Sequence, residues 1–128
     1  MAESKGPKVL VLFYSTYGHC YGMAKAIAEG VKEGGGLVTI NRVAETLSPD
    51  VLAKLGATES QKAFADVPVV KLSDITNYDA IIFGSPTRFG LMAAQMKAFW
   101  DSTGGHWFQG KLIGKVASFF TTSAMQHA

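Results

Sequence analysis

The sequence predicts one doubly wound α/β domain built on a parallel sheet. Two observations predict this fold: short, wholly apolar runs recur along the chain, and segments whose apolar residues recur at helical spacing lie between them. A third observation is that polar, glycine-containing loops follow the first and the third apolar run. Ligands of open parallel sheets bind beyond the carboxyl ends of the strands, so these two loops are the expected binding site.

The first strand–helix–strand unit spans residues 9–40. Residues 9–14 (VLVLFY) are apolar throughout, as in a strand that is buried on both faces. The next segment has the apolar positions Met23, Ala24, Ile27, Ala28 and Val31, which form one face of a helix. Glycines 34–36 end this helix, because glycine readily adopts the left-handed conformation that terminates helices. Residues 37–40 form a second strand, which a right-handed crossover makes parallel to the first.

The second half of the chain repeats this order after a less regular segment, residues 44–70. Within that segment, Pro49 can open a short helix that extends through Leu55. The remaining predicted elements are a strand at 78–83, a loop at 84–90, a helix with the apolar face Met92, Met96, Phe99 and Trp100, its end at glycines 104–105, and a strand at 116–120.

The composition excludes several classes of protein. The net charge is only +2 and the basic residues are scattered, so we expect no nucleic-acid partner. The longest strongly apolar run, residues 9–14, is too short for a transmembrane segment, and the polar leader 1–7 lacks the apolar core of a secretory signal. The single cysteine fits a reducing compartment, so we expect a cytoplasmic protein. No residues have the spacing of metal ligands.

The first candidate binding loop is residues 15–20 (STYGHC). Hydroxyl groups and free backbone N–H groups at a helix N-terminus favour a phosphate dianion, although Ser15 or Thr16 could equally be an ordinary helix cap. The loop lacks the lysine of a P-loop and the G-x-G-x-x-G turn of a dinucleotide site. Cys20 is either a thiolate favoured by the helix N-terminus or, more simply, a small packed residue.

The second candidate binding loop is residues 84–90 (GSPTRFG). Pro86 stiffens the backbone, while Gly84 and Gly90 permit close approach or unusual dihedral angles. Such a loop can border a planar ring, with Arg88 and Phe89 adding positive charge and stacking. The alternative is an ordinary turn with a surface arginine. Outside both loops, Trp107 is on a loop and suits a pocket wall or turn packing, whereas Trp100 is expected in the core.

From about Lys8 to Gln126, the chain resembles the WrbA-type NAD(P)H:quinone oxidoreductases, a flavodoxin-like family. The resemblance rests on the two loops with their preceding strands, on QMK at 95–97 and on DSTGGHW at 101–107. It implies a flavodoxin-like sheet, FMN as cofactor and NADH or NADPH as reductant. It also implies ping-pong transfer of two electrons to a quinone, and a homo-oligomer, dimer or tetramer, in the complete family member.

The resemblance also implies roles for individual positions. The FMN phosphate would be wrapped by Ser15, Thr16, Tyr17, Gly18, His19 and Cys20. The flavin ring would be bordered by Pro86, Thr87, Arg88, Phe89 and Gly90. The start of a third FMN loop would be Thr122, Ser123, Ala124, Met125, Gln126 and His127. Tyr17 and Trp107 would line the pocket where nicotinamide and quinone alternate, and no side chain is assigned as a catalytic acid or base.

Members of this family continue for roughly another half-domain, which would complete the third loop and add a helix, the fifth strand and a final helix. We therefore expect the sheet here to lack its last strand and the flanking helices, which leaves residues 116–120 as an apolar edge. The 128-residue chain alone is then expected to be poorly soluble or to bind FMN weakly. Two alternatives to the enzyme remain: a flavodoxin-type carrier of single electrons, and a non-catalytic interaction protein that has kept the fold.

Overall fold

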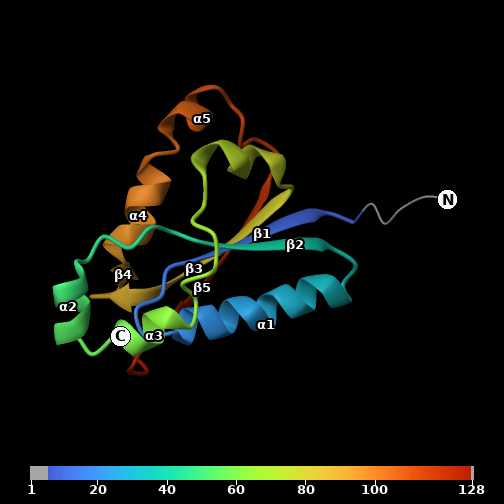
Figure 1. The fold of residues 1–128 in the computed structure, drawn as a ribbon. Helices are drawn as coiled ribbons and strands as arrows, with labels where there is room; N and C mark the ends of the chain where they lie inside the picture. The colour runs from blue at the N-terminus through green and yellow to red at the C-terminus, as the bar shows by residue number, and fades with distance from the viewer. Residues whose placement is uncertain (1–5, 128) are drawn as a thin grey trace.

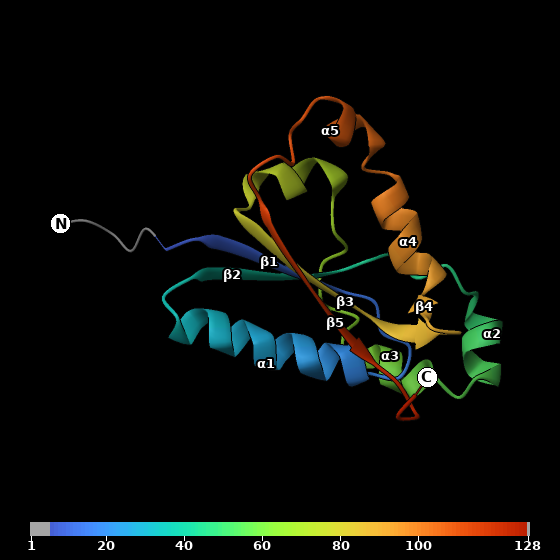
Figure 2. The same ribbon diagram turned by 180° about the vertical axis from the view of Figure 1, so that it is seen from behind.

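The computed structural model describes residues 6–127, so most of the polar leader predicted at 1–7 lies outside the described residues. The elements are β1 (Lys8–Phe13), α1 (His19–Glu33), β2 (Leu37–Arg42), α2 (Pro49–Lys54), α3 (Thr58–Lys62), the 3₁₀ helix η1 (Leu72–Asn77), β3 (Ala80–Arg88), β4 (Leu91–Met92), α4 (Ala94–Asp101), α5 (Gly104–Phe108) and β5 (Val116–Thr122). Figures 1 and 2 show the sheet with α1 and α3 on one face and α4 on the other.

The sheet has the parallel strand order β2-β1-β3-β5, with the short β4 antiparallel to the end of β3. β1 lies between β2 and β3, and Leu10 to Phe13 are fully buried. This burial on both faces explains why residues 9–14 are apolar without alternation. The predicted doubly wound parallel sheet is therefore confirmed.

Two apolar clusters fill the layers on either side of the sheet. One packs Leu10, Leu12 and Met96 between the sheet, η1 and α4. The other packs Val11, Phe13 and Ala24 between the sheet, α1 and α3. Alternate residues of β1 thus face opposite clusters, as the pleat of a strand requires. Trp100 lies against Phe83 in the first layer, with ring centroids 4.8 Å apart, in agreement with its predicted place in the core.

Three predicted boundaries were wrong. β3 does not end at residue 83 but extends to Arg88, because β5 pairs with it as far as Pro86 and β4 pairs with its last two residues. Met92 belongs to β4, so the helix predicted from that residue begins at Ala94. Glycines 104–105 do not end α4, which stops at Asp101, but begin α5. Trp107 therefore lies on a helix and not on the predicted loop. The Trp107 N–H donates to the Thr103 carbonyl at 3.0 Å, which closes this turn.

The segment 44–70 is more regular than predicted. α2 begins at Pro49, as expected, and the Ser48 hydroxyl caps it by accepting a hydrogen bond from the Val51 N–H. The second helix, α3, was not predicted. It is too short for a clear apolar period, and Phe64, which anchors its end in the core, lies just beyond it.

β5 forms an exposed edge in the described part of the chain. Its one pairing partner is β3, and Val116 and Phe119 are 66% and 48% exposed. The strand, VASFFTT, carries no charge and no proline, the features that natural edge strands use against unwanted pairing. The expectation of an apolar edge at residues 116–120 is met for all of these residues except Phe120, whose side chain is buried.

Val116→Lys should therefore raise the concentration at which the 128-residue chain stays monomeric, because a lysine on an edge strand opposes strand addition. Size-exclusion chromatography with light scattering at rising concentration measures this. Val51→Lys on α2 is the control. Val51 is also exposed, and a lysine there adds the same charge away from the edge strand. An equal gain from both variants would attribute the effect to net charge and not to the edge.

Gly84 on β3 leaves room for the ring of Phe120, its partner on β5. A Cβ atom at this position would lie 2.2 Å from the Phe120 ring. Gly84→Ala should therefore destabilise the protein by about 1–3 kcal/mol, the usual range for overpacking a core. Urea unfolding measures the change. Gly30→Ala on α1 has open space around its new methyl group and should be neutral or stabilising. An unchanged midpoint for Gly84→Ala would show that the Phe120 ring moves freely.

Candidate functional site

The first loop connects β1 to α1 and leaves the helix N-terminus uncapped. Gly18 is the N-cap residue, with φ 94°, and no side chain caps the helix. The Gly18 N–H donates to the Ser15 hydroxyl at 3.0 Å, which holds the loop against the helix. The backbone N–H groups of the first turn have no partner within the helix, and that turn has no acidic residue. The loop therefore offers free donors and a favourable helix dipole to an anion.

Gln61 on α3 supports the same loop and was not predicted from the sequence. Its side-chain amide donates to the Ser15 carbonyl at 3.1 Å and to the Thr16 carbonyl at 3.0 Å. These bonds fix the loop backbone where it leaves the sheet. No local pattern could have identified Gln61, because its partners are more than forty residues away in sequence.

The second loop is the tip of a β-hairpin. β3 and β4 pair up to Arg88 and Leu91, so Phe89 and Gly90 form a two-residue turn. Both have positive φ, 56° and 83°, as a type I′ turn requires. This conformation is unfavourable for a bulky side chain, yet Phe89 adopts it and is fully exposed. The hairpin thus presents an aromatic ring to solvent beside the first loop.

The two loops and the end of β5 meet at a small cavity of about 30 Å³. Arg88 reaches across it, and its guanidinium donates to the Thr16 hydroxyl at 2.8 Å. From the other side, the Cys20 thiol and the Thr122 hydroxyl lie 3.4 Å apart. The cavity is lined by Ser15, Thr16, Tyr17, His19, Cys20, Pro86, Arg88 and Thr122, all of which the sequence placed in the site.

Buried Ser85 fixes the second loop to its neighbours. Its hydroxyl accepts a hydrogen bond from the Ala93 N–H at 2.9 Å, and its carbonyl accepts one from the Thr121 hydroxyl at 2.8 Å. Ser85 therefore joins β3, β5 and the start of α4 directly behind the hairpin.

Other predicted site residues lie further from this cavity. Ser123, Ala124, Met125, Gln126 and His127 form an exposed segment after β5 and do not line it. Tyr17 does line the cavity, and its hydroxyl donates to the Leu55 carbonyl at 3.2 Å. α5, which carries Trp107, lies at the opposite end of the sheet from both loops (Figures 1 and 2). One copy of the described chain therefore does not bring Trp107 to Tyr17.

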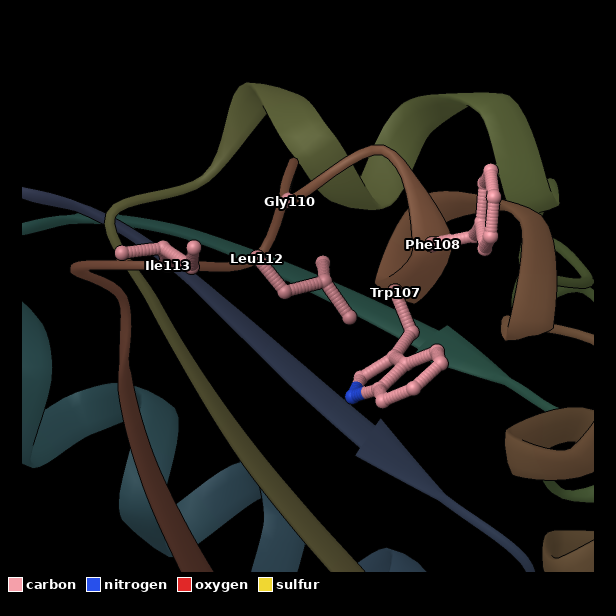
Figure 3. Close-up of a pocket in the computed structure, with 5 residues that line it drawn as sticks. All are labelled: Trp107, Phe108, Gly110, Leu112 and Ile113. Atoms are coloured by element: carbon pink, nitrogen blue, oxygen red, sulfur yellow. The ribbon is translucent and has the colours of Figure 1, made fainter.

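Trp107 instead borders a separate apolar pocket of about 610 Å³. Figure 3 shows its indole ring beside Leu112, with Phe108 on the other side of α5. Trp107 and Phe108 are 76% and 85% exposed.

A buried tyrosine lies behind the first loop. The Tyr14 hydroxyl donates to both carboxylate oxygens of Glu45, at 3.0 and 2.9 Å, and lies 3.4 Å from the Thr16 hydroxyl. Burial raises the pKa of Tyr14 to about 12; Glu45 adds to this increase, while Thr16 and Arg88 oppose it. Glu45 was not predicted from the sequence, although it follows β2 at the carboxyl edge of the sheet, where ligands of such sheets bind.

The structure favours the packed alternative for Cys20. The residue is 1% exposed, and burial raises the pKa of its thiol, although the Thr122 hydrogen bond and Arg88 act in the opposite direction. Within residues 6–127, no group of three or more His, Cys, Asp or Glu side chains is arranged to hold a metal ion. The same residues contain no helix that is both long and apolar enough to cross a bilayer.

Cys20 should therefore react slowly with iodoacetamide in the folded protein, because the thiolate is the reactive form and a raised pKa moves its formation to higher pH. At pH 8 we expect alkylation to be at least about tenfold slower than in urea-unfolded protein, where the thiol is exposed and its pKa is ordinary. Cys20 is the only cysteine, so mass spectrometry measures the rate without ambiguity. Equal rates in the folded and unfolded states would contradict the assignment.

Comparison with known proteins places this geometry in a family. The model of the flavodoxin family matches residues 11–127. Two curated relatives named NAD(P)H dehydrogenase (quinone) are similar to the chain. The one from Geobacter sulfurreducens is 57% identical over 93% of this chain and 59% of its own length. The one from Geobacter metallireducens is 56% identical over 94% of this chain and 60% of its own length. The chain thus spans about 60% of the length of these relatives.

Solved structures agree with this result. A WrbA-like flavodoxin from Agrobacterium tumefaciens has a TM-score of 0.65 and 30% identity, covering 94% of this chain and 62% of that one. An archaeal flavodoxin has a TM-score of 0.56 and covers 94% of this chain and 87% of that one; at 19% identity it supports the fold alone. The predicted resemblance to a flavodoxin-like family is confirmed, and the chain belongs to the flavodoxin family.

Proposed function

We propose that this chain carries the cofactor site of an FMN-dependent NAD(P)H:quinone oxidoreductase that reduces quinones to hydroquinones. One observation carries the proposal: the uncapped N-terminus of α1 and the exposed hairpin tip meet at the carboxyl ends of β1 and β3. The printed name of the curated relatives, NAD(P)H dehydrogenase (quinone), supports the reaction class.

The residues of the first loop fit the phosphate of FMN. Ser15 and Thr16 are buried at the base of the loop, and the free N–H groups of the first turn of α1 supply neutral donors. Arg88 spans the cavity, but its side chain is exposed and can swing toward a bound phosphate. Tyr17, Gly18, His19 and Cys20 complete the loop.

The residues of the second loop fit the edge of a planar ring. Pro86 and Thr87 form the end of β3, and the Thr87 hydroxyl accepts a hydrogen bond from the Gly90 N–H at 3.1 Å. This bond stabilises the turn that exposes Phe89. We propose that Phe89 and Arg88 border the flavin, and that Thr122 and the segment that follows it contribute the third loop.

When bound, FMN would supply the redox chemistry, the transfer of two electrons from NAD(P)H to a quinone in two separate half-reactions. The protein binds and orients the cofactor and the two substrates in turn. No side chain is needed as an obligatory acid or base. Tyr17 would line the substrate pocket. Since Trp107 lies at the far end of the sheet, it could line this pocket only from a second copy of the chain, in keeping with a homo-oligomer. We propose the cytoplasm as its compartment, because the single cysteine fits a reducing environment.

One observation favours a second candidate, a non-catalytic interaction protein. The proposed third loop, residues 123–127, is exposed and follows an edge strand, so it has less support than the other two. A chain that keeps the fold, binds no FMN and still assembles with a partner would fit this candidate. A one-electron carrier is a third possibility, and the redox experiment below distinguishes it.

We expect FMN to bind saturably to the purified chain, with quenching of flavin fluorescence. Thr16→Val should weaken binding by about tenfold, because it removes a hydroxyl from the base of the phosphate site. Thr39→Val is the matched control, since Thr39 is exposed on β2. Absence of saturable quenching by the unaltered chain would contradict the FMN site.

Loaded protein should then oxidise at most one equivalent of NADH or NADPH per flavin on its own, and should turn over with ping-pong kinetics when benzoquinone is added. Stepwise photoreduction monitored by absorbance distinguishes the carrier. A stable one-electron form with no quinone turnover would identify a carrier, whereas direct two-electron reduction would support the enzyme.

A further inference from the structure

Glu45 connects three segments that surround the candidate site. Its carboxylate accepts hydrogen bonds from the Tyr14 hydroxyl at the end of β1 and from the backbone N–H groups of Thr46 and Leu47, at 3.0 and 3.3 Å, after β2. It also accepts one from the Gln95 amide on α4, at 3.1 Å. A side chain from the end of β1, one from α4 and a turn of the backbone therefore converge on one half-buried carboxylate.

The hydrogen bonds between Glu45 and the site run in one direction. Arg88 donates to the Thr16 hydroxyl, the Thr16 hydroxyl donates to the Tyr14 oxygen, and the Tyr14 hydroxyl donates to Glu45. A carboxylate can only accept, so it orients the phenol proton toward itself and leaves the phenol oxygen to accept from Thr16. The chain of donors thus links the second candidate loop, through the first, to Glu45.

We propose that Glu45 is a positioning residue for the phosphate-binding loop: through Tyr14 it holds Thr16, and through Gln95 it ties the start of α4 to that loop. This inference rests on the proposed FMN function. Glu45 does not line the cavity formed by the loops, so it acts through other residues and not by touching the ligand. A loop held in its bound geometry before the ligand arrives binds more tightly, because less ordering remains to be done on binding.

Glutamine would fill this role only in part. The Thr46 N–H, the Leu47 N–H and the Gln95 amide all donate to Oε2 of Glu45, whereas the Tyr14 hydroxyl lies within hydrogen-bond distance of both Oε1 and Oε2. An amide has one acceptor oxygen, which would take the Oε2 place, so its NH₂ group would face the Tyr14 hydroxyl. That NH₂ group would donate to the Tyr14 oxygen and compete with the Thr16 hydroxyl for it.

The test compares FMN with riboflavin, which has the same ring without the phosphate. Glu45→Gln should weaken FMN binding by about tenfold and leave riboflavin binding unchanged, because only the phosphate-binding loop is disturbed. Fluorescence quenching measures both affinities. Glu29→Gln is the matched control: Glu29 lies on the exposed face of α1, 3.3 Å from Lys32, and should change neither affinity.

Tyr14→Phe is the second variant, for use also if Glu45→Gln fails to fold. It should also cause a selective loss of FMN affinity, and the double variant should lose no more than Glu45→Gln alone, because Tyr14 acts through its bond to Glu45. An equal loss for FMN and riboflavin, or no loss at all, would overturn the positioning role. If the unaltered chain binds FMN no more tightly than riboflavin, the proposed phosphate site is contradicted, independently of the effect of the Glu45 variants.

Discussion

The parallel pairing of β1 with β3 is the constraint on which the rest of the structure depends. Its register places Phe13, the last residue of β1, opposite Gly84, so the loop after β1 and the end of β3 lie at the same edge of the sheet. The uncapped helix after β1 and the hairpin of β3 and β4 are therefore neighbours. Neither loop is a site alone: one offers donors for an anion and the other an exposed ring. The hydrogen bond from Arg88 to Thr16 connects the two loops.

Residues that touch no ligand keep this edge in place. Gln61 holds the backbone of the first loop from the α1 side of the sheet, and Ser85 holds the base of the hairpin. Glu45 adds a connection from β2 to β1 and α4. Each of these side chains is polar and at least half-buried, and each bonds to backbone or side-chain groups of another segment. The polar groups at the end of the sheet therefore serve the fold and the candidate site together.

Elements that a local sequence pattern marks were predicted, whereas features that depend on contacts between residues distant in sequence were missed. The wholly apolar run of β1 and the helical period before Gly34 were sufficient for the first unit. Gly84 and Pro86 suggested a loop, yet β5 and β4 pair with that segment and extend β3 through it. The roles of Gln61 and Glu45 depend on contacts with residues dozens of positions away. Trp107 was predicted to line the same pocket as Tyr17. However, α4 runs back along the sheet, so α5 and Trp107 lie at its other end (Figure 1). A role for Trp107 in a substrate pocket stays a prediction.

The three candidate loops differ in how strongly the described residues support them, and this difference bears on how FMN would bind. The first loop follows a fully buried central strand and has Gln61 and Tyr14 behind it. The second is a hairpin joined to α4 and β5 by Ser85. The third begins at Thr122, at the end of a strand with one exposed edge. Phosphate affinity should therefore depend mainly on β1 and its neighbours, whereas contacts from residues 123–127 depend on how well β5 is held.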